Sequence, residues 1–308
     1  MREGATTVVG LAAADEKAGT RESTSTADWI DLTKPRIATL VTVTAAVGYV
    51  MGSAGPVDFA RLVIALVGTA LAAGGAGALN HVVERDVDAK MRRTKNRPVP
   101  AGRVDPNSAL AYGLSLSALG LTLLWFGANP WTSILGLLTI LLYIGVYTPL
   151  KKVTPLNTLV GAVPGAIPPV MGWMAASGGL DWGAVVLFSI LFLWQLPHFL
   201  SIAWMYREDY ARGGLEMLPT RDPDGKVTGR VAATYGLALV PVSLAPTPLG
   251  LAGGLYFFGA IVLGFAFFGF AVALAVKRDR RRARRVLLAS VTYLPALLTL
   301  LVIDRVAV

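Results

Sequence analysis

Long apolar stretches alternate with short polar segments along almost the whole chain. A helix that crosses a bilayer needs about 20 predominantly apolar residues, and nine stretches meet this requirement. They cover residues 37–54, 59–83, 108–128, 131–149, 156–176, 183–206, 231–248, 250–276 and 285–304. A chain in lipid must satisfy its backbone hydrogen bonds internally, and these stretches are too long for barrel strands. We therefore predict an all-α polytopic membrane protein with nine transmembrane helices.

The first 28 residues depart from this pattern, because they are small and polar and include several acids. Their most apolar segment, residues 8–14, is followed at once by Asp15 and Glu16. A signal peptide has an apolar core of about 7–15 residues and a cleavage site after it. We interpret residues 1–28 as a disordered cytoplasmic tail rather than a cleaved signal. Residues 29–308 then form a single transmembrane domain.

The composition agrees with a membrane protein. Hydrophobic residues make up 54% of the chain and charged residues only 15%, whereas a soluble domain carries about 25% charged residues. An ordinary soluble enzyme is therefore excluded. The chain has no cysteine, which also excludes disulfides, thiolate metal sites and a cysteine nucleophile.

The formal net charge of +9 follows the predicted topology. Of 28 lysine and arginine residues, all but Arg61 and Arg305 lie in the N-terminal segment or in alternate loops. Such residues collect on the cytoplasmic side of membrane proteins. We predict a multi-pass protein of the bacterial inner membrane, with a cytoplasmic N-terminus and an external C-terminus. The basic run at residues 277–285 then indicates topology and contact with the lipid bilayer, and no nucleic acid is expected as a partner.

Topology does not explain the acids at the end of the second stretch. If that helix continues beyond its apolar part, Asn80, Glu84 and Asp88 share one face at intervals of four residues. Carboxylate and amide oxygens suit Mg²⁺, which also binds substrate phosphates. Charged residues at a helix end usually form a solvated membrane edge, but here an arginine-rich loop follows directly. The donors that a diphosphate needs are present in that loop, at Arg93, Thr94 and Arg97.

Two more loops bring polar residues to the same predicted membrane face. After the sixth stretch, Asp209 lies level with the acids above and would add a carboxylate for a second metal ion. Its neighbours Tyr206 and Arg207 are candidates for substrate binding. A lysine pair after the fourth stretch is normally a membrane anchor, but one of the two would contact phosphate oxygens if the acids bind metal. The candidates there are Tyr147, Lys151 and Lys152.

Polar and proline residues also occur inside the predicted spans. His198 lies about three turns deeper than Asp209. A polar residue inside a membrane is a functional hypothesis by default, although a lone histidine can also be a satisfied packing residue. In the fifth stretch, Pro164, Pro168 and Pro169 are tolerated if neighbouring groups or a cavity satisfy the freed backbone. We interpret this helix as a kinked wall of a central cavity.

These residues together resemble the UbiA superfamily of intramembrane prenyltransferases, and within it the branch that farnesylates heme. The superfamily signature is an asparagine, acids four and eight residues later, and an arginine-rich stretch, which residues 80–97 match with Glu84 in place of a frequent aspartate. Further segments are similar to the heme branch: ERDVDAKMRRTKNRPVPAGRV, YTPLKKVTPLNTLVGAVPGAIPPVMGW and LFLWQLPHFLSIAWMYREDYARGGLEMLP. There are departures. YREDY is not a full DxxxD motif, which puts the second metal's ligands in doubt apart from Asp209, and LPHF replaces the expected PPHF.

The resemblance implies that heme B, farnesyl diphosphate and water give heme O and diphosphate. It implies that Mg²⁺, held by the catalytic residues Asn80, Glu84, Asp88 and Asp209, neutralises the leaving diphosphate. His198 would ligate heme iron or assist a proton transfer. The implied partners are farnesyl diphosphate, heme B, the lipid bilayer, and a downstream heme-modifying enzyme or cytochrome oxidase assembly.

Two alternatives stay open at this point. One is the same chemistry on an aromatic quinone precursor, because quinone-precursor prenyltransferases share the first motif. The other is a secondary transporter, a class that often carries internal repeats and charged groups near the bilayer midplane. The acids here lie at one membrane face and no convincing repeat is present, which favours the enzyme.

Overall fold

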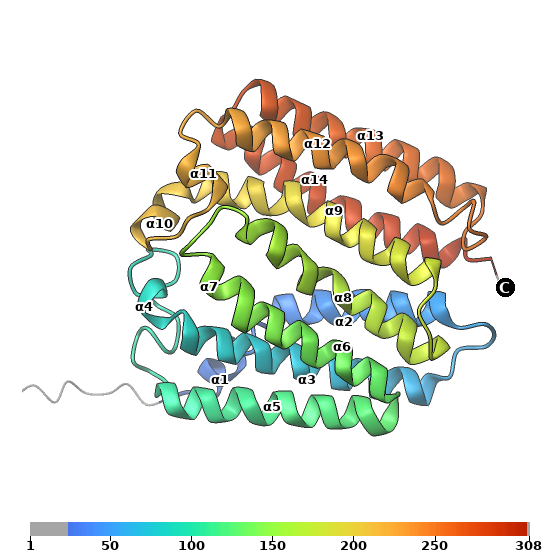
Figure 1. Ribbon diagram of the computed structural model, residues 1–308, viewed down its shortest axis with the longest axis horizontal. Helices are drawn as coiled ribbons and strands as arrows, with labels where there is room; N and C mark the ends of the chain where they lie inside the picture. The colour runs from blue at the N-terminus through green and yellow to red at the C-terminus, as the bar shows by residue number, and fades with distance from the viewer. Residues whose placement is uncertain (1–23, 307–308) are drawn as a thin grey trace, which may run out of the picture.

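The computed structural model describes residues 24–306, and in this part of the chain it is a bundle of long helices (Figure 1). Nine helical segments are long and apolar enough to cross a membrane, which confirms the predicted spans to within a few residues. Eight are single helices: α2 (Pro35–Gly52), α3 (Phe59–Val83), α5 (Pro106–Gly127), α8 (Asn157–Ser177), α9 (Trp182–Met205), α12 (Lys226–Leu244), α13 (Gly254–Val276) and α14 (Arg280–Ile303). The remaining segment is Pro130–Leu150. The predicted central cavity stays a prediction.

The segment Pro130–Leu150 changes its helical geometry along its length. It begins as α6 (Pro130–Leu141), continues as a π-helical stretch, η1 (Leu142–Tyr147), and ends as α7 (Thr148–Leu150). A π-helical turn is rare and is often found at functional sites. Its position at one end of the bundle therefore draws attention to the residues around it.

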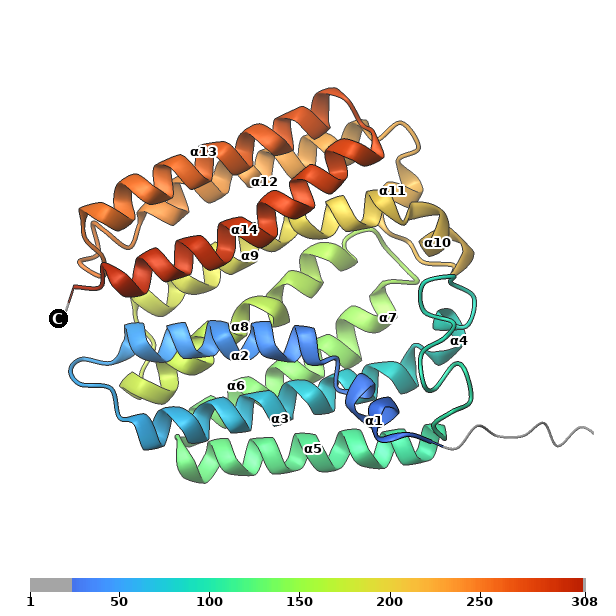
Figure 2. The ribbon, with the colours of Figure 1, turned by 180° about the vertical axis from the view of Figure 1, so that it is seen from behind.

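Four short helices complete the described chain. They are α1 (Thr26–Leu32), α4 (Arg85–Asp88), α10 (Arg207–Arg212) and α11 (Leu218–Arg221). Figures 1 and 2 show α4, α10 and α11 together at one end of the bundle, while the C-terminus lies at the opposite end. The basic loops after α3, α7, α9 and α13 belong to the end that carries these short helices, as the alternation of charge predicts.

The predicted boundary of the N-terminal tail needs a correction. Residues 1–23 of that tail lie outside the described residues, but residues 24–28 are ordered. Ser25 caps α1 through a capping box with Asp28, in which each side chain accepts a hydrogen bond from the other residue's backbone amide. Asp28 also pairs with Arg103 at 2.8 Å. The folded chain therefore begins before residue 29.

Small residues allow the central helices to pack closely. Helix α2 lies against α8, and α8 lies against α9. A side chain at Gly48 of α2 would clash with the carbonyl oxygen of Pro169, and one at Gly172 of α8 would clash with the carbonyl oxygen of Ala45. Such close approach is typical of helix pairs in membranes. Pro164, Pro168 and Pro169 are all buried within α8, the most buried of the nine spans.

Candidate active site

The three predicted oxygen donors of the first motif come together where α3 ends. The expected continuous helix is wrong in detail, because α3 ends at Val83 and Glu84 turns away from helical geometry (φ −92°, ψ 2°). The backbone bonds are nevertheless kept across the break. The amide of Glu84 donates to the carbonyl of Asn80 (2.9 Å), and the amide of Asp88 donates to that of Glu84 (2.8 Å). The spacing of four residues therefore still places three side chains on one side.

The side chains of Asn80, Glu84 and Asp88 are all buried, and each of them contacts a different cationic side chain. Asn80 and Asp88 have no exposed surface, and Glu84 is 9% exposed. Arg97 Nη1 lies 2.6 Å from Asp88 Oδ2, and Lys151 Nζ lies 2.8 Å from Glu84 Oε1. The ammonium of Lys34 donates to the amide oxygen of Asn80. Three oxygen groups and three cations thus alternate within one buried cluster.

The donor set fits a Mg²⁺ ion. Asp88 Oδ1 is buried and has no hydrogen-bond partner within residues 24–306. A buried carboxylate oxygen that lacks a partner is costly unless something binds it. Asn80 and Glu84 add hard oxygen atoms on the same side. In the described chain no three His, Cys, Asp or Glu residues gather as a metal cluster, so the amide of Asn80 and substrate oxygens would complete the coordination.

Lys34 is a site residue that sequence reasoning missed. It has the positive φ angle of 50°, which is unique among the non-glycine residues that the structure describes, and it directly precedes Pro35 of α2. This conformation is costly for a residue with a Cβ and is found where the surroundings impose it. Burial, together with the nearby charge of Arg97, lowers the pKa of Lys34 to about 7. The protonation of the Lys34 ammonium group therefore depends on the charged groups around it.

The π-helical stretch supplies an aromatic wall beside these cations. Tyr143 and Tyr147 stack with their ring centres 5.9 Å apart. The hydroxyl of Tyr143 lies 3.3 Å from Lys34 Nζ, and Lys151 Nζ lies 4.4 Å from the centre of the Tyr147 ring. Tyr147 was predicted from the sequence, whereas Tyr143 was not. The two rings are four residues apart, a spacing that places side chains on one face of a helix, so Tyr143 could have been found from Tyr147.

The two members of the lysine pair have different surroundings. Lys151 is half-buried against Glu84 and Tyr147, with 14% of its side chain exposed, while Lys152 is exposed. Burial by itself would raise the pKa of Glu84, but the positive charges of Lys151 and Lys34 outweigh this and lower it. Glu84 is therefore a carboxylate at neutral pH. Only Lys151 of the pair is placed to reach a diphosphate beside Glu84.

Asp209 has a different environment from the one expected for a metal ligand. Its two carboxylate oxygens accept hydrogen bonds from the backbone amides of Arg92 (2.8 Å) and Arg93 (3.1 Å), and Arg212 pairs with it. Burial would raise the pKa of Asp209, but Arg212 and the two amides lower it overall. In this arrangement Asp209 fixes the loop that carries Arg93 and Arg97 to α10.

The remaining predicted residues of these loops have structural contacts of their own. Thr94 is buried, and its hydroxyl donates to the carbonyl of Asp88 (3.0 Å). Arg93 lies over the rings of Tyr206 and Tyr210. Arg207 turns back over Trp204 and donates to its carbonyl. Of these, Arg93 belongs to the loop whose Arg97 pairs with Asp88, and Tyr206 lies against Arg93.

His198 lies on α9 with one ring nitrogen fixed by α14. Its Nδ1 is 2.7 Å from Ser290 Oγ, and the ring stacks on Trp194 at 4.9 Å. The Ser290 hydroxyl also lies 2.7 Å from the carbonyl oxygen of Leu287, to which it can donate. In that arrangement the hydroxyl accepts a hydrogen bond from Nδ1–H of His198, and the neutral ring keeps its lone pair on Nε2. No hydrogen bond to Nε2 exists within the described residues.

Comparisons of the sequence with protein-family profiles and with known proteins agree with each other. The sequence profile of the UbiA prenyltransferase family matches residues 41–294. The protoheme IX farnesyltransferase of Solibacter usitatus is 48% identical over 287 residues, which cover 90% of this chain and 98% of that protein. The corresponding protein of Salinibacter ruber is 47% identical, with the same coverage of both chains.

A solved structure has the same fold. A UbiA homologue from Archaeoglobus fulgidus, bound to GPP and Mg²⁺, superposes with a TM-score of 0.65. The two sequences are 15% identical, and the match covers 89% of this chain and 99% of the other. At this identity the likeness concerns the fold alone.

Proposed function

This chain belongs to the UbiA prenyltransferase family, and we propose that it transfers a farnesyl group from farnesyl diphosphate to a vinyl group of heme B. Water completes the reaction, and the products are heme O and diphosphate. One observation carries the proposal: three buried oxygen donors, each in contact with a cation, lie at one end of a transmembrane bundle. Such a cluster suits a diphosphate with its metal ion.

Farnesyl diphosphate would bind at the cluster of Asn80, Glu84 and Asp88. These three residues would hold Mg²⁺, which supplies positive charge that neutralises the diphosphate as it leaves. Asp209, the fourth expected ligand, also accepts hydrogen bonds from the amides of Arg92 and Arg93, and its part in metal binding stays a prediction. Lys34, Arg97 and Lys151 stand beside the three oxygen groups and would donate charge-assisted hydrogen bonds to the phosphate oxygens.

The same cations have two uses in the cycle. Without substrate they neutralise buried oxygens that would otherwise be costly to keep in a membrane protein. With those oxygens engaged by a bound metal, Lys34, Arg97 and Lys151 would be free to donate to the diphosphate. The bond between C1 of the farnesyl chain and the diphosphate oxygen breaks, the bonding electrons leave with the diphosphate, and an allylic cation forms. Fixed positive groups stabilise the charge that develops on the leaving group.

The terminal carbon of the heme vinyl group attacks this allylic cation and forms the new carbon–carbon bond. The cation left next to the porphyrin ring is captured by water, which loses a proton and becomes the hydroxyl of the side chain. Apolar walls would limit the access of water until that step.

We assign to His198 the ligation of heme iron. A metal-binding histidine usually donates its other ring N–H to a protein acceptor, which fixes the tautomer. Ser290 provides that acceptor for Nδ1, and Nε2 keeps the lone pair that iron needs. Proton transfer is the alternative role, and it uses the same lone pair.

Several observations support heme over an aromatic quinone precursor as acceptor. The relatives at 47–48% identity, which match 90% of this chain, are protoheme IX farnesyltransferases. A mid-span histidine with a free lone pair suits a metalloporphyrin, whereas a hydroxybenzoate has no metal to bind. A secondary transporter finds no support in the family match.

A competition assay tests the proposal. The purified protein in detergent, with Mg²⁺ and radiolabelled farnesyl diphosphate, should transfer label to heme B and not to 4-hydroxybenzoate. Transfer of the label to 4-hydroxybenzoate alone would show that the acceptor is an aromatic quinone precursor and not heme B. Binding of Mg²⁺ and diphosphate without transfer to any acceptor would overturn the enzyme assignment.

We also propose that the end with the basic loops faces the cytoplasm, which accessibility of residues 277–279 to a membrane-impermeant protease would test.

A further inference from the structure

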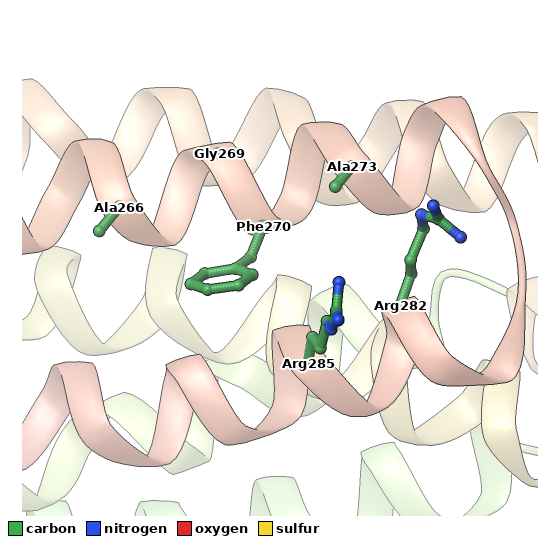
Figure 3. Close-up of a pocket in the computed structure, with 6 residues that line it drawn as sticks. All are labelled: Ala266, Gly269, Phe270, Ala273, Arg282 and Arg285. Carbon is green, nitrogen blue, oxygen red and sulfur yellow. The ribbon is translucent and has the colours of Figure 1, made fainter.

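A groove runs along the outer face of the bundle between α13 and α14. It consists of two adjoining hollows of about 330 and 470 Å³, which share Ala266, Phe270 and Arg285. Figure 3 shows the first hollow, with Arg282 and Arg285 of α14 directed into the space beside α13. The second hollow continues along the helices to Leu263 and Thr292. The groove therefore has a charged end and a long apolar part.

The apolar part exists because α13 presents small residues to it. Ala266, Gly269 and Ala273 line the first hollow at intervals of three and four residues, which places them on one face of the helix. A side chain added at Gly269 would meet no atom within 4 Å. By contrast, side chains at Gly259 and Gly264 of the same helix would meet Leu300 and Val240. The space beside Gly269 is therefore open, whereas Gly259 and Gly264 face neighbouring side chains.

The length of the groove matches one leaflet of a bilayer. The lining residues extend from Leu263 to Ala273 along α13, which is about 15 Å of helix at 1.5 Å per residue. The hydrocarbon core of a bilayer is about 30 Å thick, so each leaflet contributes about half of that. Both α13 and α14 are membrane spans, so the groove faces lipid tails along this length.

The charged end of the groove lies where α14 begins. Arg282 and Arg285 are three residues apart and share a face of the helix. Arg285 has no hydrogen bond or ion pair within the described residues, and Arg282 pairs through one nitrogen with Asp279. Asp279 is the single acid in residues 277–285, against seven basic residues. The guanidinium groups therefore keep donors available at the level of the lipid headgroups.

We propose that this groove is a binding site for an anionic phospholipid of the leaflet next to the basic loops. The phosphate lies between Arg282 and Arg285, because a guanidinium matches phosphate oxygens in charge and geometry. One acyl chain lies along the face made by Ala266, Gly269 and Ala273. Juxtamembrane clusters of basic residues recognise anionic lipids in this way.

A prenyl diphosphate also has an anionic head and an apolar tail, but the groove lacks what such a substrate needs. Its lining residues include no carboxylate or amide oxygen that could hold a metal ion. The oxygen donors Asn80, Glu84 and Asp88 belong to α3, α4 and the turn between them. A phospholipid needs no metal ion, which favours it as the occupant. The proposal does not depend on the proposed reaction.

Native mass spectrometry of the full chain, released from detergent with added lipid, tests the site. The probes are phosphatidylglycerol, phosphatidylcholine, inorganic phosphate and farnesyl diphosphate. We expect the wild type to retain phosphatidylglycerol in preference to phosphatidylcholine. The double variant R282Q/R285Q should bind phosphatidylglycerol about tenfold more weakly, and Gly269→Leu, which fills the groove, should have a similar effect.

Two matched controls locate the effect. R281Q/R284Q removes the same charge from the same run at positions that do not line the groove. Gly254→Leu adds the same bulk to α13 at another glycine whose side-chain position is open. Both should bind phosphatidylglycerol like the wild type. Equal loss in R281Q/R284Q, no loss in Gly269→Leu, or displacement of the lipid by inorganic phosphate or farnesyl diphosphate would overturn the proposal.

Discussion

Arg97 Nη1 lies 2.6 Å from Oδ2 of Asp88, while Oδ1 of the same carboxylate is buried and has no hydrogen-bond partner within residues 24–306. One oxygen is thus neutralised by a cation, and the other is left for a ligand. Similar pairings occur at Glu84 with Lys151 and at Asn80 with Lys34. Oδ1 of Asp88 is therefore the oxygen of this cluster that is left for a metal ion.

The first prediction concerns Asp88. Asp88→Asn keeps the size of the side chain but removes the negative charge that Mg²⁺ requires. Because the metal contributes several kcal/mol to stabilisation of the leaving group and each 1.36 kcal/mol is a factor of ten, we expect the rate of farnesyl transfer to fall by about 100-fold or more. Single-turnover transfer from labelled farnesyl diphosphate measures the loss.

Asp86 on the same short helix provides the matched control. It is exposed and pairs only with the neighbouring Arg85. Asp86→Asn should therefore retain wild-type transfer. An equal loss in both variants would show that the effect arises from the net charge of the segment and not from a metal ligand.

The second prediction separates the two lysines after α7. Lys151→Met removes the cation beside Glu84, and we expect the KM for farnesyl diphosphate to rise about tenfold, since a hydrogen bond to a charged group contributes about 1.5–3 kcal/mol. Lys152→Met removes an exposed charge of the same type. Its steady-state kinetics should resemble the wild type, and a larger effect at Lys152 would contradict the placement of the diphosphate.

The third prediction concerns the tautomer of His198. Ser290→Ala removes the acceptor of the Nδ1 hydrogen, so the ring can also hold its hydrogen on Nε2. Loss of such a supporting contact typically lowers metal affinity 10- to 100-fold. We expect heme B affinity, followed by Soret absorption, to fall by about tenfold in Ser290→Ala and further in His198→Ala.

Ser189→Ala is the control for this experiment, because Ser189 is a half-buried α9 residue whose hydroxyl donates to the Val185 carbonyl of its own helix. It should bind heme like the wild type. Unchanged heme spectra in His198→Ala together with loss of the hydroxylated product would assign His198 to proton transfer instead of iron ligation.

The fourth prediction is a pH dependence of stability at the start of the chain. The Arg103 guanidinium and the Ser25 amide hold the pKa of Asp28 below its usual value near 3.8. The unfolded chain therefore takes up the proton more readily than the folded one, so acidification through this range favours unfolding. Asp28→Asn should lower the thermal stability in detergent above about pH 5.

The difference between wild type and Asp28→Asn should shrink as the pH falls below 4, because the wild-type carboxyl becomes protonated. Scanning fluorimetry from pH 3 to pH 7 measures this. A difference that stays constant over the whole range would show that the pair with Arg103 contributes no electrostatic stabilisation.

Local patterns were sufficient for much of the fold and part of the site. Apolar length predicted the nine spans, and the spacing of Asn80, Glu84 and Asp88 predicted that they share a side even though the helix breaks at Glu84. The choice between Lys151 and Lys152 needed the structure. The two lysines are adjacent at a helix end and look alike in the sequence. Their different burial in the structure distinguishes them.

The missed contacts join residues far apart in the chain. Lys34 meets Asn80 across 46 positions, and in the sequence it is one more basic residue at a membrane edge. The oxygens of Asp209 accept hydrogen bonds from the amides of Arg92 and Arg93. Backbone donors leave no signal in a sequence. Tyr143, by contrast, lies four residues before Tyr147, so helical spacing alone was enough to place it on the same face.

The most direct test of the central claim is the mass of the heme product. The purified protein is incubated with heme B, farnesyl diphosphate and Mg²⁺, and the extracted hemes are analysed by mass spectrometry beside the Asp88→Asn variant. We predict a heme heavier than heme B by one farnesyl group and one hydroxyl group, formed by the wild type and absent with the variant. Heme B recovered unchanged from the wild type, or equal product from both proteins, would contradict the account.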